Sequence, residues 1–351
     1  MKPSDARRAW APVGDGNDAR ECVEDVSTSR ASGGGCLASR AREVVLEADP
    51  RVKAALAHAA YEAVLRGDIE IVSDAFAEGG VEMPSRPSRP SRPRLVPPKE
   101  VPNPKNSPLG AAAHVMHNVA HIELNAIDLA MDTVARFAPL RDVLPEQFYI
   151  DFAHVADDES RHLLWCLQRL EELGASYGDM VAHDVLWEGA EATASDPLAR
   201  LAVVPCMQEA RGLDAGPRLV ERLVGHGDSR SAAIIRRISD EEVGHVAVGA
   251  AWFRTVCAAL ADCDDVGSDK IAAATFRGYI RRLAPDALRG PFNADDRARA
   301  GIDPSWYSDD ESSAVAVERR IEPLNIDAAR ALRDRLGAVV ALELGASESD
   351  P

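Results

Sequence analysis

The chain has 351 residues, of which 46% are hydrophobic and 28% are charged, so it can bury a substantial core in one large domain or two smaller ones. Its net charge of −17 argues against a broad phosphate-binding surface, because nucleic-acid binders need positive potential. The six cysteines form no C-x-x-C pair, which favours a reduced, cytoplasmic compartment. No run approaches the roughly eighteen apolar residues of a membrane span, and no secretory signal is expected.

The N-terminal part begins with two segments of different character. Residues 1–36 mix Gly, Ser, Asp and Arg without periodicity and are expected to form a disordered leader. Residues 37–83 then show helical periodicity that is broken at Pro50. This pattern predicts short N-terminal helices rather than one long one.

Residues 84–106 are rich in proline and arginine and contain a threefold Ser-Arg-Pro repeat. Such a composition predicts an extended, polyproline-like strap. The arginines from Arg86 to Arg94 leave two interpretations open. They could touch an acidic partner or RNA. A solvated strap that lies across the protein's own acidic surface is favoured, since charge runs are usually solvated.

Residues 107–263 are expected to form the main domain, because they hold four long apolar patterns of helical period. The links between the first and second patterns, and between the third and fourth, are short and predict antiparallel neighbours. The link over 174–195 is long enough to cross a bundle. Two hairpins joined by one long crossover predict an all-α, ferritin-like four-helix bundle with peripheral helices. The expected bundle helices are 107–138, 145–174, 196–224 and 228–262.

Residues 264–345 are expected to form a C-terminal helical extension. It begins with an apolar segment over 269–283 and ends with a helix over about 326–344. Between them lies the stretch Gly290-Pro291-Phe292-Asn293. Residues 346–351 are expected to be a disordered tail.

Single glutamates alternate with Glu-x-x-His pairs along the four expected helices, each near a helix midpoint. Midpoints of similar-length helices meet at one level of a bundle, because each residue of offset is only about 1.5 Å. Four-helix bundles that hold two iron or manganese ions take their ligands from glutamates and Glu-x-x-His pairs arranged in this way. The candidate metal ligands are Glu123, Glu159, His162, Glu209, Glu242 and His245.

All four glutamates are centred on apolar stripes, where a carboxylate is costly unless it is paired or binds a metal. No lysine or arginine shares those faces, so four carboxylates at one level would repel each other. Two cations remove both problems. Each Glu-x-x-His pair taken alone is more often a solvated helix face, and the specificity lies in the combined order, level and apolar setting.

An acidic residue precedes each candidate histidine by four positions: Asp158 for His162, and Glu241 for His245. Such an acid can accept the other ring proton of its histidine and fix the tautomer. We therefore expect each acid to serve the histidine of its own helix. The alternative is that both are ordinary acidic surface residues.

Two glycines follow the candidate ligands at helical spacing. Gly212 lies one turn after Glu209, and Gly249 lies two turns after Glu242. Small residues there are expected to leave a pocket for oxygen or substrate, although close helix packing explains them equally well. The histidines at 114, 117 and 121 point away from Glu123 and are expected to serve packing.

Residues 158–162, Asp-Glu-Ser-Arg-His, resemble the D-E-x-R-H motif of bacterial multicomponent monooxygenases. Over about 40–310 the chain resembles a bacterial ferritin-like family of unknown function, within the dinuclear carboxylate superfamily. That family is similar in layout to the tRNA hydroxylase that acts on methylthio-isopentenyl-adenosine, which implies hydroxylation by analogy. The runs that carry the resemblance are His121 to Ile127, Ala156 to Glu159, Glu209 to Asp214, Asp240 to His245 and Gly290 to Asn293.

The expected function is a non-haem dinuclear iron oxidoreductase, an O2-dependent hydroxylase or oxidase, with manganese or a mixed iron–manganese pair left open. Since the sequence has no flavin, nicotinamide or iron–sulfur motif, electrons are expected from a separate reductase or ferredoxin. The substrate is expected to be a small molecule or a modified nucleoside, and a homodimer is left open. One alternative is a ferritin-like ferroxidase, iron-handling or peroxide-scavenging protein. The other is a non-catalytic helical binding protein.

Overall fold

The computed structural model describes residues 35–79, 81–261 and 265–308. Every regular element in these ranges is a helix, and the only strand-like pairings there are two isolated bridges. The predicted all-α class is therefore confirmed. Residues 1–34 of the expected leader, the helix over about 326–344 and the C-terminal tail lie outside the described residues. The expected end of the leader at 36 was wrong, because Cys36 is 1% exposed and caps the first described helix.

Helices α2 (Leu37–Leu46) and α3 (Pro50–Leu65) form an N-terminal layer, followed by the single turn α4 (Asp74–Ala77). The break between α2 and α3 follows from local chemistry. Asp49 caps α3 by accepting from the backbone N–H groups of the first turn, and Pro50 occupies the first helical position, where no N–H is needed. The layer packs on the long helices, with α2 against α5 and α3 against α6.

The proline-rich segment lies across the protein and contains only two short 3-10 turns, η2 (Pro98–Glu100) and η3 (Pro104–Asn106). Arg86 forms ion pairs with Asp184 and Glu191, both in the crossover. Arg89 reaches further inwards and pairs with the buried Asp128 of α5. Two arginines of the repeat therefore bind acids of the same chain.

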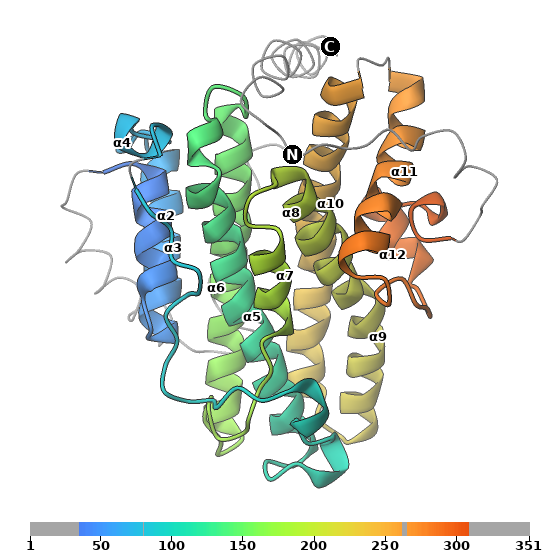
Figure 1. Ribbon diagram of the computed structural model, residues 1–351. Coiled ribbons are helices and arrows are strands. Elements are labelled where there is room, and N and C mark those ends of the chain that lie inside the picture. The colour runs from blue at the N-terminus through green and yellow to red at the C-terminus, as the bar shows by residue number, and fades with distance from the viewer. Residues whose placement is uncertain (1–34, 80, 262–264, 309–351) are drawn as a thin grey trace, which may run out of the picture.

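Four long helical segments stand side by side and form the centre of the molecule (Figure 1). The short links at 137–145 and 226–228 make the first pair and the last pair antiparallel neighbours, with α5 against α6 and α9 against α10. Between the pairs runs the crossover, which contains α7 (Val185–Ala192). The segments are α5 (Ala111–Arg136), α6 (Glu146–Glu172), the composite α8 (Pro197–Val203), η5 (Val204–Glu209) and α9 (Ala210–Gly225), and α10 (Ser229–Ala261).

Helix α5 begins four residues later than the expected start at 107. The chain enters it through Gly110, whose φ of 75° lies in the left-handed region that favours glycine. Ser107 accepts a hydrogen bond from the N–H of Leu109, so its side chain closes a turn before the helix. The cap-like Ser107-Pro108 pair therefore marks a turn, and the predicted start was wrong.

The sequence predicted a continuous third helix over 196–224. In the structure this helix is interrupted by one π-helical turn, η5. Pro205 lies in this turn; it has no N–H for the helical ladder, and its ring disfavours the regular turn before it. A Cβ added at Gly249 of α10 would lie 2.2 Å from Cβ of Pro205. Gly249 therefore allows η5 to approach α10 closely, and the expectation that it lines a pocket is corrected to close packing.

The crossover is held against α5 by the histidines that were expected to serve packing. Gly178 donates its N–H to Nε2 of His117 at 3.0 Å. His121 lies 2.8 Å from the carbonyl oxygen of His183 and 2.7 Å from the hydroxyl of Tyr177. This stripe faces the crossover and does not reach the candidate ligands.

Helix α10 packs against α6, α9 and α11 (Asp265–Leu283). By length and composition alone, Ser229–Leu260 would suffice to cross a membrane, with a mean hydropathy of 1.4. This is weak support for a span, because 56% of its apolar window is buried inside the structure and core helices of soluble proteins pass the same test. Its apolar character is explained by its central position.

The chain closes over α9 and α10 with α12 (Ala294–Arg299) and η6 (Pro304–Trp306). Asn293 caps α12 and donates its backbone N–H to Asp214 of α9 at 2.8 Å. Arg297 forms two hydrogen bonds with the same carboxylate. The Gly290 to Asn293 stretch thus fastens the C-terminal part to the third helix.

Candidate metal centre

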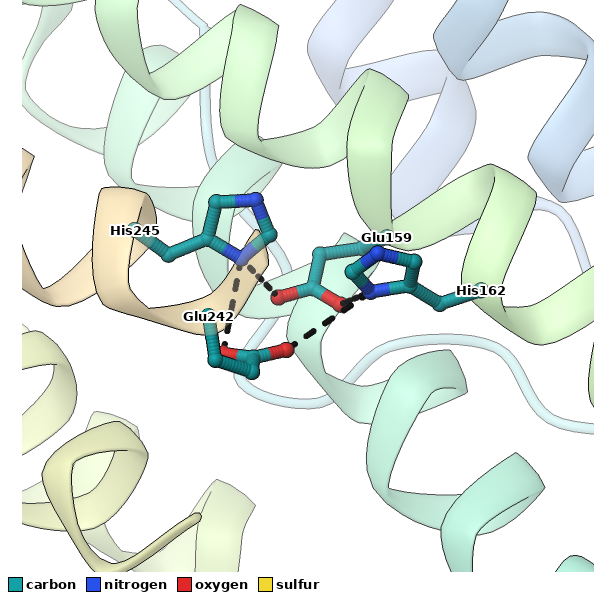
Figure 2. Close-up of side chains that lie close together, drawn as sticks. All are labelled: Glu159, His162, Glu242 and His245. Atoms are coloured by element: carbon teal, nitrogen blue, oxygen red, sulfur yellow. Dashed lines mark hydrogen bonds and ion pairs between the residues drawn. The ribbon is translucent and has the colours of Figure 1, made fainter. Parts of the chain in front are cut away.

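Four of the six predicted ligands form one compact cluster between α6 and α10 (Figure 2). One ligand atom from each of these residues lies within 4.8 Å of every other. We call Glu159, His162, Glu242 and His245 the four-residue cluster. Each helix contributes one Glu-x-x-His pair, because residues three apart lie on the same helix face.

Each glutamate of the cluster faces both histidines. The two oxygens of Glu159 lie 3.2 Å from Nδ1 of His162 and 3.0 Å from Nδ1 of His245. The oxygens of Glu242 lie 3.6 and 3.4 Å from the same two nitrogens. Both carboxylates therefore span the two halves of the site, and both histidines turn Nδ1 towards its centre.

The remaining two predicted ligands border the cluster from α5 and η5. Glu123 is buried at 2% exposure, and one of its oxygens lies 3.5 Å from Nδ1 of His162. Glu209, the last residue of η5, is half-buried and close enough to be influenced by the charges of Glu242 and Glu159. The structure thus places Glu123 in contact with the cluster and Glu209 beside it, outside the group of four.

The acids preceding the histidines serve the opposite helix. Glu241 of α10 lies 2.9 Å from Nε2 of His162 on α6, and Asp158 of α6 lies 3.3 Å from Nε2 of His245 on α10. The expected pairing within each helix was therefore wrong. Because Nδ1 of each histidine faces the centre of the site, its Nε2 faces the neighbouring helix. Each histidine is therefore oriented by the acid of the other helix, and we call Asp158 and Glu241 the exchanged acids.

Arg161 connects the two exchanged acids, a role that the sequence did not reveal. Its side chain is 2% exposed and bonds Asp158 and, at 3.1 Å, Glu241. Arg237 pairs with Glu241 as well, at 2.5 Å, so two arginines balance the charge of the two acids. Arg161 also holds α6 against α10 behind the histidines. The signal in the sequence was an arginine on the buried side of α6 between the two members of a Glu-x-x-His pair.

The surroundings raise the pKa of Glu123 and Glu209 and lower the pKa of Glu159. Burial, followed by the charge of Glu159, raises the pKa of Glu123 well above its usual value. Burial, followed by the charge of Glu242, raises the pKa of Glu209 to about 8. Burial also acts to raise the pKa of Glu159, but the charge of His245 and bonds to its neighbours outweigh it and hold that pKa below its usual range.

The histidines carry the compensating positive charge. Burial would lower the pKa of His162, but hydrogen bonds to the surrounding carboxylates, with Glu123 first, raise it well above its usual value. The pKa of His245 is raised in the same way, chiefly by the charges of Glu159 and Glu242. Among the described residues, no lysine or arginine forms an ion pair with any of the four predicted ligand glutamates. Without a metal ion, the raised pKa of each histidine therefore favours its imidazolium form beside the carboxylates.

Three buried ligand atoms, Oε2 of Glu123, Oε2 of Glu209 and Nδ1 of His245, make no well-oriented hydrogen bond within the described structure. Two of them still face an oppositely charged neighbour, at 3.5 Å for Glu123 and 3.0 Å for His245, whereas Oε2 of Glu209 has no such contact there. Leaving such atoms without partners is costly in a protein interior. A bound cation would satisfy all three, and carboxylates with imidazoles suit iron, manganese and other divalent first-row metals. The residues present therefore fit a metal centre.

A cavity of about 190 Å³ adjoins the site on the outer side of His245. Its wall includes the exchanged acids Asp158 and Glu241, as well as Gly244, whose missing Cβ leaves open space. Gly212 is exposed, and a Cβ added there would meet nothing within 4 Å. The space at Gly212 is therefore solvent, and the lining of the cavity beside His245 does not include Gly212. The sequence analysis did not predict this cavity or the role of Gly244 in it.

Comparisons with known proteins place all six predicted ligands within one family match. The model of a family described as a protein of unknown function, DUF455, matches residues 46–308. An uncharacterized protein of Haemophilus influenzae is 36% identical over 211 residues, which make up 59% of this chain and 70% of the relative. No solved structure matches significantly.

Proposed function

The chain belongs to the DUF455 family, and since that family brings no known activity, we propose from its side chains that it is a dinuclear metal oxidoreductase with a ferritin-like bundle. Glu123, Glu159 and His162 hold one metal ion on the α5–α6 side. Glu209, Glu242 and His245 hold the other. Iron is the favoured metal, with manganese or a mixed pair as the alternative.

The observation that supports this proposal most is the pair of carboxylates that face both histidines. Glu159 and Glu242 each have one oxygen directed to His162 and one to His245. Each of these two carboxylates would therefore be able to help hold both ions. A solvated ion-pair network does not explain it, because the cluster is almost entirely buried and has orphaned ligand atoms at its edges.

The surrounding residues orient the ligands and control protons. Asp158 and Glu241 fix each imidazole through Nε2, which keeps Nδ1 turned towards the metal positions. Arg161 and Arg237 balance the charge of these two acids, so that the acids do not compete for the cations. Bound iron would supply one-electron redox chemistry and the activation of dioxygen for hydroxylation or oxidation of an organic substrate.

The partners of this reaction follow from what the chain does not supply itself. Electrons come from a separate reductase or ferredoxin, since the sequence carries no motif for a second redox cofactor. The substrate is a small molecule or a modified nucleoside. The cavity beside His245 has about 190 Å³, which suits dioxygen, water or a small polar molecule rather than a bulky substrate.

The proposal is tested first by metal content. Protein purified without oxygen should contain two iron or manganese ions per chain, and His245→Ala should contain less. Asp157→Asn serves as the matched control, because Asp157 neighbours the site on α6 but binds His58 of the N-terminal layer. Wild-type protein without iron or manganese, or an unchanged metal content in His245→Ala, would contradict the proposal.

The reaction itself is tested by its products. Metabolites and modified RNA nucleosides from cells with and without the protein should differ by the mass of one oxygen atom in at least one compound. Cells that carry His245→Ala should match the cells without the protein. Rapid conversion of free ferrous iron into a mineral core, with no such product, would instead favour iron storage.

A further inference from the structure

A larger cavity, of about 430 Å³, lies apart from the candidate metal centre. Arg136, the last residue of α5, lines it and lies thirteen positions after Glu123, which corresponds to about 20 Å along the helix. Its walls come from α2, residues 82–85 at the start of the strap, the end of α5, and α7 with the residues after it. The volume falls within the range of small-molecule sites, roughly 300–1,000 Å³.

Two guanidinium groups line this cavity, and only some of the N–H donors of each are used in hydrogen bonds to the protein. Arg136 uses Nε and one terminal nitrogen to bind Asp132 and the carbonyl oxygen of Pro84. Arg42 uses Nε to bind the carbonyl oxygen of Glu82 at 3.1 Å. Within the described part of the chain, the other terminal nitrogen of Arg136 and both of Arg42 have no hydrogen-bond partner. These donors are therefore positioned and free to bind an anion.

The opposite part of the wall is apolar. Trp187 is 1% exposed and donates its Nε1–H to the carbonyl oxygen of Ser85 at 2.9 Å, so it supports the wall from behind. The half-buried Met83 and Ala194 provide the accessible apolar surface. Such a wall favours a ligand with an apolar body beside its charged group.

The rim limits how much negative charge the ligand can carry. Glu82 and Glu191 both line the cavity, and both are exposed to solvent. Arg86 neutralises Glu191 through an ion pair of 2.9 Å, whereas Glu82 has no ion-pair partner among the described residues. A multiply charged phosphate would be repelled by these carboxylates, while a single negative charge can sit between the arginines.

We propose that this cavity binds a small organic monocarboxylate. The carboxylate is held by Arg42 and Arg136, and the apolar body lies against Met83 and Ala194. The ligand would tie α2, the strap, α5 and the crossover helix α7 together. The proposal does not depend on the metal centre, since none of these residues is a candidate metal ligand.

The test measures binding of benzoate to the full-length, metal-loaded protein by titration calorimetry, with benzyl alcohol and inorganic phosphate as comparison probes. Benzoate should bind at one site per chain and raise the melting temperature. The neutral alcohol should bind more weakly because it lacks the charge, and phosphate because it lacks the apolar body. Equal binding of benzyl alcohol, tighter binding of phosphate or no binding of benzoate at millimolar concentration would overturn the proposal.

Two variants locate the site. Arg42→Gln should weaken benzoate binding about tenfold, the effect of losing one charge-assisted contact. Arg66→Gln is the control, since Arg66 is an exposed arginine that pairs with Glu62 and Asp68 outside the cavity. Ala194→Leu fills the apolar part and should abolish binding while the helical circular dichroism and the metal content stay unchanged. Wild-type affinity in both Arg42→Gln and Ala194→Leu would place the ligand elsewhere and refute the proposal.

Discussion

Helices α6 and α10 and the composite third helix all bring a glutamate to the same site, but by different means. On α6 and α10 the ligands lie in regular helix, close in pairs, and are oriented by acids from the opposite helix. On the third helix, Glu209 stands alone at the end of a π-helical turn, and one of its oxygens has no partner. The first arrangement is held together by ion pairs among its own residues, whereas Oε2 of Glu209 has no partner within the described structure.

Removing one glutamate from each region should show the difference between the two regions most clearly. Glu159→Ala removes a carboxylate that faces both histidines, so it should abolish binding of both metal ions, with an affinity loss greater than about 100-fold. Glu209→Ala should lose one ion and retain the other, because the four-residue cluster stays intact. Metal analysis of the two variants after dialysis tests this prediction, and equal metal contents would show that the two regions do not differ.

The stability of the metal-free protein should depend on pH through Glu209. Burial raises the pKa of this residue to about 8, above its ordinary 4.5, so the folded state binds a proton that the unfolded state has released. Its stabilising effect is therefore fully present below 4.5 and is lost as the pH rises through about 8. Urea unfolding of the metal-free protein should show lower stability at about pH 9 than at about pH 6.

Glu209→Gln provides the control for this prediction, since the amide cannot ionise and the difference between the two pH values should shrink. Bound metal should also reduce the difference, because coordination holds the carboxylate ionised at both pH values. A pH dependence that is the same in wild type and Glu209→Gln would assign the effect to other groups.

The smallest expected effect concerns the two glycines near the third helix. Gly249→Ala places a Cβ 2.2 Å from that of Pro205, so it should shift η5 and lower the free energy of unfolding by about 1–3 kcal/mol. Gly212→Ala meets nothing within 4 Å and should stabilise α9 by about 0.5–1 kcal/mol. Chemical unfolding of both variants measures the contrast. If Gly249→Ala were as stable as Gly212→Ala, close packing would not position Glu209.

The sequence predicted the regular parts of the fold well because they follow from periodic apolar faces. The bounds of α6 and α10 lie within two residues of the expected ones. The start of α5 was missed because Gly110, rather than Ser107, supplies the required backbone conformation. The π-helical turn was missed because Pro205 was not recognised as an interruption in an otherwise apolar pattern.

The candidate site shows a similar division. The Glu-x-x-His pairs were predictable, since spacing along one helix determines which side chains share a face. The exchange of Asp158 and Glu241 was not, because it depends on which ring nitrogen faces inwards and on the neighbouring helix. The positions of Arg42 and Trp187 were likewise hidden, since the cavity that they line joins segments that are distant in the sequence.

The exchanged acids affect how the protein unfolds. Neither α6 nor α10 contains both a histidine and the acid that orients it, so neither hairpin can assemble half of the site by itself. Separation of the two hairpins would leave Arg161, the acids and the imidazoles without their partners at the same moment. The two hairpins should therefore lose their structure in a single cooperative transition, and a fragment that ends before α10 should hold no metal.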